Sequence, residues 1–155
     1  MIVATMTVPE AIAEALADLP SVQNKLSSVI AAQKKEHRRD RRAGDRITVA
    51  SYTSKRKNNW MYAVTTTKKL TSHNVLMWYY DKIGLCGLQL SYQGLHNLYT
   101  AHFFTRYRER SGHGEPAAEA NLKAFFTRNH GFPTIRTGKL HHGFQATLSA
   151  VPPTV

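Results

Sequence analysis

The feature that most constrains the fold is a region, Arg46 to Tyr92, in which strand-forming segments alternate with turn signals. The segments are rich in Thr, Val, Tyr and Trp, which favour β-structure. Turn-forming residues interrupt the region at 57–59, 71–74 and 81–84. This spacing predicts four strands joined by short loops in an antiparallel meander. The predicted strands cover about 46–55, 60–67, 74–80 and 85–92.

The second predicted strand is apolar on both sides. Trp60, Tyr62 and Val64 alternate with Met61 and Ala63. Because successive side chains of a strand point to opposite faces, this pattern predicts that both faces of the sheet are at least partly covered.

Helices are expected before the sheet. Thr7 and Glu10 have the spacing of a capping box, which predicts a short helix from about 8 to 17. Pro20 is expected to interrupt it, and a second helix is predicted from 21 to 42.

The apolar stripe of that second helix fades beyond Ala32. Its last turns are therefore expected to project into solvent as a basic arm, which ends before Gly44.

After the sheet, a helical period returns at 95–112, a further helix is predicted at 115–129, and a final hairpin at 132–151. We therefore predict an α+β fold, with an antiparallel sheet packed against a central helix at 97–111 and an N-terminal helical extension. The predicted domains are a helical arm with a basic end and an α+β domain. Their bounds are 1–45 and 46–155.

Net charge indicates the kind of partner. The 155 residues include 21 Lys or Arg and 10 Asp or Glu, a formal charge of +11. Residues 34–69 contribute +9 of it, against −2 for 1–33, 0 for 70–95 and +4 for 96–155. Candidate nucleic-acid ligands in the basic segment are Lys34, Lys35, Arg38, Arg39, Arg41, Arg42, Lys55, Arg56 and Lys57, and a further run is Lys68 and Lys69.

Two interpretations of these runs remain open. They could be solvated charge that favours the negative end of a helix dipole, partly neutralised by Glu36 and Asp40. They could also bind phosphates, because neutralising phosphates releases counterions and gives a salt-sensitive affinity. Three runs in one segment favour a polyanionic partner.

The sequence also predicts several absences. The longest apolar run, 75–80, is far shorter than the roughly 18 residues of a membrane span, so no membrane partner is expected and a cytoplasmic location is predicted. The lone cysteine, Cys86, has no partner for a disulfide and no zinc-binding spacing around it. No metal or cofactor is therefore predicted.

The segment most suggestive of chemistry is 98–110. Tyr99, Phe103 and Tyr107 recur every four residues and form, with Phe104, an apolar stripe that would pack on the sheet. At the edge of this stripe, three polar side chains recur at the same interval. They are His102, Arg106 and Arg110.

An imidazole followed by two guanidinium groups on one helix face, with Thr100 as helix cap, suits a phosphodiester. Imidazole transfers protons near neutral pH, and Arg donates bidentate hydrogen bonds to phosphate. The structural alternative is that Arg106 pairs with Glu109 and that His102 and Arg110 are ordinary helix-surface residues.

The pattern Thr-x-His-x-x-x-Arg-x-x-x-Arg, followed by a second helix and strands, resembles the small ribonuclease-fold domains of the barnase, EndoU, colicin and RelE superfamily, especially BrnT-like toxins. The resemblance covers about 99–144. It implies metal-free RNA cleavage, often by a toxin that an acidic antitoxin or inhibitor protein holds inactive. By position, Thr100, His102, Arg106 and Arg110 match the helix motif. The leader 1–45 and the strand-rich block depart from the compact family pattern.

Such cleavage needs a base, an acid and cations for the pentacovalent phosphorus. His102 is the candidate base or acid, and Arg106 and Arg110 are the candidate phosphate ligands. The complementary proton donor could be His141, His142 or Tyr107. Further phosphate ligands could be Arg136 or Lys139. The alternative for His141 and His142 is that they lie in an exposed turn without a catalytic role.

A binding role without chemistry is the main alternative function. A phage or mobile-element protein could hold nucleic acid with the basic arm and with sheet aromatics, although core burial is the expectation for Trp78 and Tyr80. A third possibility is an interaction protein that docks on an acidic partner. The aromatic residues in question are Trp60, Tyr62, Trp78, Tyr79, Tyr80 and Tyr92.

Overall fold

The computed structural model describes residues 1–40, 42, 44–90, 96–112 and 117–130. In this part of the chain, a long helix precedes five strands and two shorter helices. The elements are α1 (Val8–Arg39), β1 (Arg46–Thr53), β2 (Asn59–Thr66), β3 (Thr71–Tyr80), β4 (Leu85–Gln89), β5 (Asn97–Tyr99), α2 (Ala101–Ser111) and α3 (Ala118–Asn129).

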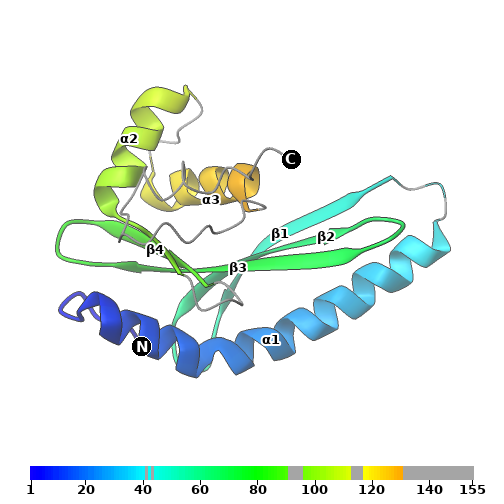
Figure 1. Ribbon diagram of the computed structural model, residues 1–155, viewed down its shortest axis with the longest axis horizontal. Helices are drawn as coiled ribbons and strands as arrows, with labels where there is room; N and C mark the ends of the chain where they lie inside the picture. Colours follow the sequence, from blue (N-terminus) through cyan, green and yellow to red (C-terminus); the bar gives the residue numbers. More distant parts are fainter. Residues whose placement is uncertain (41, 43, 91–95, 113–116, 131–155) are drawn as a thin grey trace, which may run out of the picture.

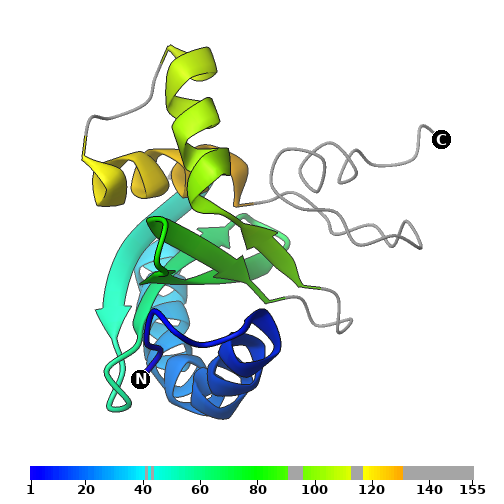
Figure 2. The same cartoon turned by 90° about the vertical axis from the view of Figure 1, so that its left-hand side faces the viewer.

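The sheet is an antiparallel meander in which the strand order is β1-β2-β3-β4-β5. β1 and β2 pair over their full length, from Arg46 opposite Thr66 to Thr53 opposite Asn59. All four strands predicted from the sequence are present, with boundaries shifted by up to three residues, and the predicted α+β fold class is confirmed. Helices cover both faces of the sheet, α1 on one and α2 and α3 on the other (Figures 1 and 2).

α1 begins as predicted, because Thr7 and Glu10 form the complete capping box. The prediction that Pro20 divides this region into two helices is wrong, since α1 is continuous through it. Proline has no N–H to donate to the carbonyl of Leu16, and Figure 1 shows that α1 bends along its length. Because Leu16 is exposed, its carbonyl group can bond to water instead.

The last turns of α1 are not a detached arm. The Gln33 side chain is buried, and its amide donates to the backbone carbonyls of Arg46 (3.1 Å) and Val64 (3.4 Å). The helix is therefore attached to the sheet beyond the point where its apolar stripe fades. The sequence missed this contact because the packing residue is polar.

Two cores lie on opposite faces of the sheet. The core facing α1 joins Val22 and Leu26 to Trp60 and Val64. The core facing α2 and α3 includes Met61, Ala63, Leu76, Tyr99, Phe103, Phe104, Leu122, Phe125 and Phe126. The alternation of apolar side chains in β2 thus predicted correctly that both faces are covered.

The helical region predicted from 95 begins later than expected. Tyr99 lies in the short strand β5, and Thr100 caps α2 by accepting a hydrogen bond from the Phe103 amide. Gly112, at φ 62°, ends α2 in the left-handed conformation that glycine tolerates. α3 begins three residues later than its prediction, and the predicted hairpin at 132–151 lies outside the described residues.

Candidate nucleic-acid interface

Three segments that are separated in the sequence meet at one end of the sheet. They are the last turns of α1, the first residues of β1 and the β2–β3 turn, all at the right in Figure 1. The register explains the meeting, because Arg46 pairs with Thr66 immediately before the turn. Gln33 attaches α1 to the same two strands.

The side chains at this end are highly cationic. It carries eight Lys or Arg and three Asp or Glu among the described residues, hence a net charge of +5. All eight cationic residues are exposed. We call this surface the basic end: Lys34, Lys35, Arg38, Arg39, Arg42, Arg46, Lys68 and Lys69, with Glu36, Asp40 and Asp45.

Local hydrogen bonds order parts of the basic end. The Thr67 hydroxyl accepts from the amides of Lys69 (3.2 Å) and Leu70 (3.0 Å), which fixes the β2–β3 turn. Arg46 and Glu36 form an ion pair of 2.6 Å between two half-exposed side chains. Arg46 thus already forms an ion pair within the protein, whereas Lys68 and Lys69 extend from a turn whose backbone is held by hydrogen bonds.

The cationic run at 55–57 lies at the opposite end of the sheet, in the β1–β2 turn. The structure therefore divides the basic segment of the sequence between two ends and does not bring all the predicted ligands together. Arg56 donates to both Glu14 carboxylate oxygens, with Nε–Oε1 and Nη2–Oε2 distances of 2.9 and 2.7 Å. This guanidinium, together with the Met1 amino group and the Asn58 amide, holds the pKa of Glu14 well below its usual range.

Beneath this turn lies a polar network that the sequence interpretation missed. Asp18 is buried, and its Oδ2 accepts from Ser54 Oγ (2.6 Å), Asn58 Nδ2 (2.9 Å) and Trp60 Nε1 (2.9 Å). The available signal was the spacing of Glu14 and Asp18, which places two carboxylates one turn apart on α1. The network joins the first half of α1 to the β1–β2 turn.

The predicted catalytic group lies on the other side of the sheet. His102, Arg106 and Arg110 are all exposed on α2, and their i, i+4, i+8 spacing places them along one helix face. Figures 1 and 2 show α2 and α1, which carries most of the basic end, on opposite faces of the sheet. The candidate catalytic residues and the main basic surface are therefore not adjacent.

One contact on α2 agrees with the alternative in which Arg106 pairs with Glu109 and does not bind a ligand. Arg106 Nη1 pairs with Glu109 Oε2 at 3.0 Å, and both side chains are about half exposed, so the pair adds little stability. Tyr107 packs on Phe103 and Phe125, about 140° around the helix from His102. The other candidates, His141, His142, Arg136, Lys139 and Arg41, lie outside the described residues.

The sheet aromatics are divided between core and surface. Trp60 and Tyr62 are buried against α1, which removes them from any stacking surface. Trp78 is partly buried beside the other core, as expected, but the predicted burial of Tyr80 is wrong because this residue is 48% exposed. It ends β3, and its hydroxyl donates to Glu119 at 3.3 Å. Tyr92 is not among the described residues.

The described residues contain neither a candidate metal site nor a helix suited to span a membrane. Within them, no group of three or more His, Cys, Asp or Glu side chains is placed to hold a metal ion. None of the described helices combines the length and apolar character needed to cross a membrane. Cys86 is buried, and its pKa rises to about 12 because of burial and the hydrogen bond to Asp81.

Comparison with known proteins gives no relative: no family model, no curated protein and no solved structure matches this chain.

Proposed function

We propose that this protein binds nucleic acid, and RNA in particular, through the basic end. The observation that supports the proposal is that three segments with exposed cationic residues, the end of α1, the start of β1 and the β2–β3 turn, lie at one end of the sheet. A strand of phosphates that contacts several of them releases counterions, which is the main source of affinity in such complexes.

The helix-dipole explanation covers only part of this surface. Cations in the last turn of α1 stabilise the negative end of that helix. Lys68 and Lys69, however, belong to the turn between β2 and β3 and not to the last turn of α1, where the dipole acts most strongly. Their position beside the end of α1 is better explained by a shared polyanionic ligand.

A pair of charge-matched variants tests the proposal. The basic-end variant combines Lys34→Gln, Arg38→Gln and Lys68→Gln, which removes three charges from that surface. The control combines Lys55→Gln, Lys57→Gln and Lys82→Gln, all in turns at the opposite end of the sheet. Anisotropy of a labelled single-stranded RNA measures binding against salt concentration.

The basic-end variant should bind more weakly, and its slope of log K against log salt should fall by about 2, at about 0.7 per lost phosphate contact. The control should keep a slope within about 0.5 of the wild type. Equal losses in the two variants would contradict a localised site. Copurification of an acidic protein, with no affinity for RNA, would favour the alternative of an interaction protein.

Metal-independent RNA cleavage is a second, separate proposal. It is supported by the exposure of His102, Arg106 and Arg110 on one face of α2, with Thr100 as the helix cap. In this proposal His102 transfers the proton and the two arginines bind phosphate, as expected for a toxin of the ribonuclease type.

The test incubates RNA with the protein in EDTA and compares His102→Ala, Arg106→Ala and a neighbouring control, Arg108→Ala. Cleavage should fall by about 100-fold in His102→Ala, because general acid–base catalysis contributes about that much. It should also fall in Arg106→Ala and persist in the control. Intact RNA with wild-type protein, or unchanged cleavage by His102→Ala, would leave binding as the function. Growth arrest on expression, relieved by an acidic partner, would identify a toxin.

A further inference from the structure

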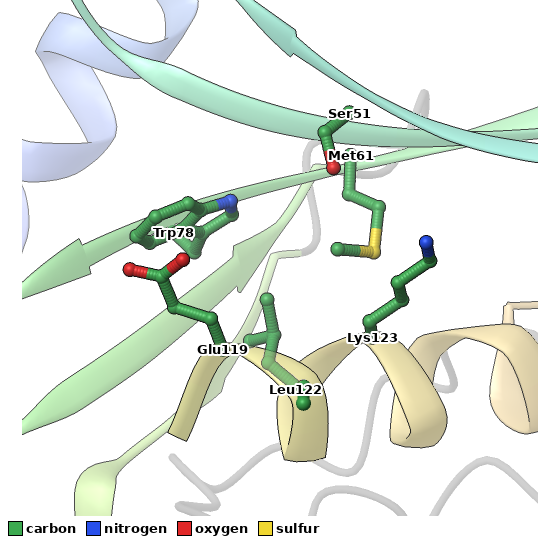
Figure 3. Close-up of a pocket in the computed structure, with 7 residues that line it drawn as sticks. Ser51, Met61, Trp78, Glu119, Leu122 and Lys123 are labelled. Carbon is green, nitrogen blue, oxygen red and sulfur yellow. The ribbon is translucent and has the colours of Figure 1, made fainter. Parts of the chain in front are cut away.

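A pocket of about 170 Å³ lies between the sheet and α3 (Figure 3). β1, β2 and β3 supply Ser51, Met61 and Trp78, respectively, and α3 supplies further lining residues. This pocket belongs neither to the basic end nor to the exposed face of α2. The lining residues from α3 that matter here are Glu119, Leu122 and Lys123.

The pocket contains an unpaired donor. The Trp78 indole nitrogen, Nε1, is buried and has no hydrogen-bond partner among the described residues. On the other face of the sheet, by contrast, the Trp60 indole donates to Asp18 at 2.9 Å. A buried donor without an acceptor costs free energy, so a ligand that brings an acceptor to Trp78 recovers that cost.

The rest of the lining combines apolar and charged groups. Met61 and Leu122 are buried residues of the core beside the pocket. Glu119 and Lys123 lie one turn apart on α3, and Figure 3 shows their charged groups on different sides of the opening. Glu119 is oriented by the hydroxyl of Tyr80, which donates to it at 3.3 Å.

We propose that this pocket binds a pyrimidine nucleobase. The volume matches one six-membered ring, because an apolar cavity of about 150 Å³ holds benzene. A pyrimidine carbonyl accepts from Trp78, its N–H or exocyclic amine donates to Glu119, and its faces contact Met61 and Leu122. Lys123 is then placed for the sugar or phosphate. A hydrocarbon would leave the indole unpaired, and a sugar lacks the flat apolar faces.

Two-dimensional NMR of the indole N–H groups tests the proposal directly, because the chain has two tryptophans on opposite faces of the sheet. Titration with uridine or cytidine should shift the Trp78 resonance and leave that of Trp60 unchanged. Guanosine, with its larger base, should bind at least tenfold more weakly. The proposal would be overturned if the Trp78 resonance shifted neither with millimolar nucleoside nor with a pyrimidine oligonucleotide. It would also be overturned if guanosine bound as tightly as uridine.

Substitutions at the rim separate ligand binding from structural effects. Ser51 is exposed, so Ser51→Phe should fill the pocket and lower uridine affinity at least tenfold, whereas Ser51→Ala should retain it. Trp78→Phe removes the donor and should weaken uridine binding about tenfold, which titration calorimetry measures because this variant lacks the Trp78 resonance. An unchanged Trp60 resonance confirms that each variant is folded, and unchanged uridine affinity in a folded Ser51→Phe would overturn the proposed location.

The ligand could be a free nucleoside or an unpaired nucleotide within RNA. If uridine alone shifts Trp78, the pocket accepts free ligands; if only a single-stranded pyrimidine oligonucleotide does so, the base arrives as part of a strand. The basic-end variant should retain uridine binding. Failure of the pocket proposal therefore leaves the salt-dependent RNA affinity intact, and failure of the RNA proposal leaves the uridine result intact.

Discussion

Asp18 shows how one buried residue joins distant segments of this chain. Its Oδ2 accepts three hydrogen bonds, from a serine, an asparagine and a tryptophan of the β1–β2 region. These partners lie 36 to 42 residues away in the sequence. The Ser54 and Trp60 donors depend on this one oxygen, whereas the Asn58 amide also donates to Glu14 Oε1 at 3.0 Å.

Asp18→Ala should lower the free energy of unfolding by about 3 kcal/mol, because it leaves the buried Ser54 hydroxyl and Trp60 indole without their acceptor and removes one of the two acceptors of the Asn58 amide. Urea denaturation followed by tryptophan fluorescence measures the change. Asp45→Ala, at an exposed position, is the control and should change stability by less than about 0.5 kcal/mol. Trp60→Phe should cost less in the Asp18→Ala background than in the wild type, and equal costs would contradict the coupling.

Glu14 predicts how stability depends on pH. Its pKa is lowered in the folded protein, mainly by the Arg56 guanidinium. When the pH falls through the ordinary glutamate range, about 4.3, Glu14 therefore takes up a proton in the unfolded chain before it does so in the folded protein. Stability contributed by Glu14 is therefore complete above this range and is lost as the pH falls below it. When the pH is lowered from 6 to 3, the midpoint of urea denaturation should fall less for Glu14→Gln than for the wild type. Parallel profiles would contradict this role.

At the scale of elements, α1 combines a helix-breaking residue with a continuous helix. Residues on both sides of Pro20, such as Ala15 and Leu26, are buried against the sheet. Packing along both halves thus offsets the lost hydrogen bond and the steric cost of the proline ring. Helix propensity alone could not reveal this compensation, because the sheet residues that provide it follow later in the chain.

Pro20→Ala should stabilise the protein by up to about 3 kcal/mol, the difference in helix propensity, since Pro20 is exposed and alanine restores the N–H to the Leu16 carbonyl. Thermal unfolding followed by circular dichroism measures the gain. Ser27→Ala, also exposed on α1, should give only a few tenths of a kcal/mol. A loss of stability in Pro20→Ala would instead show that α1 must bend to follow the sheet.

At the scale of the whole molecule, the sheet separates two cores and also separates the charged groups. α1 covers one face with Ala15, Val22 and Leu26, while α2 and α3 cover the other with aromatic residues. The basic end and the α2 residues consequently occupy different faces. The proposed binding and the proposed cleavage should therefore be removed by separate substitutions.

A fragment of residues 46–155 should not unfold cooperatively, because loss of α1 exposes the large residues Trp60 and Met77 on one sheet face. Circular dichroism melts and the dispersion of NMR resonances measure its folding. Addition of a 1–45 peptide should restore the transition. A cooperative transition of the fragment alone would instead show that 46–155 is an independent domain.

Local patterns in the sequence were sufficient to predict the capping box at Thr7, the four strands of the meander, the coverage of both faces by β2 and the exposed face of α2. These features depend on neighbouring residues and on periods of 2 and 3.6, so a linear pattern contains them. The strand at Asn97–Tyr99 was not predicted, because its helical spacing continues that of α2 and pairing with β4 sets its conformation.

Which charges share a surface, by contrast, follows from strand pairing and helix packing. One cationic segment of the sequence is divided between the two ends of the sheet, and Lys68 and Lys69 join α1 through the pairing of β1 with β2. The Asp18 network, the role of Gln33 and the unpaired indole of Trp78 also emerge only in three dimensions. Each depends on contacts between residues far apart in the chain, which composition and period do not specify.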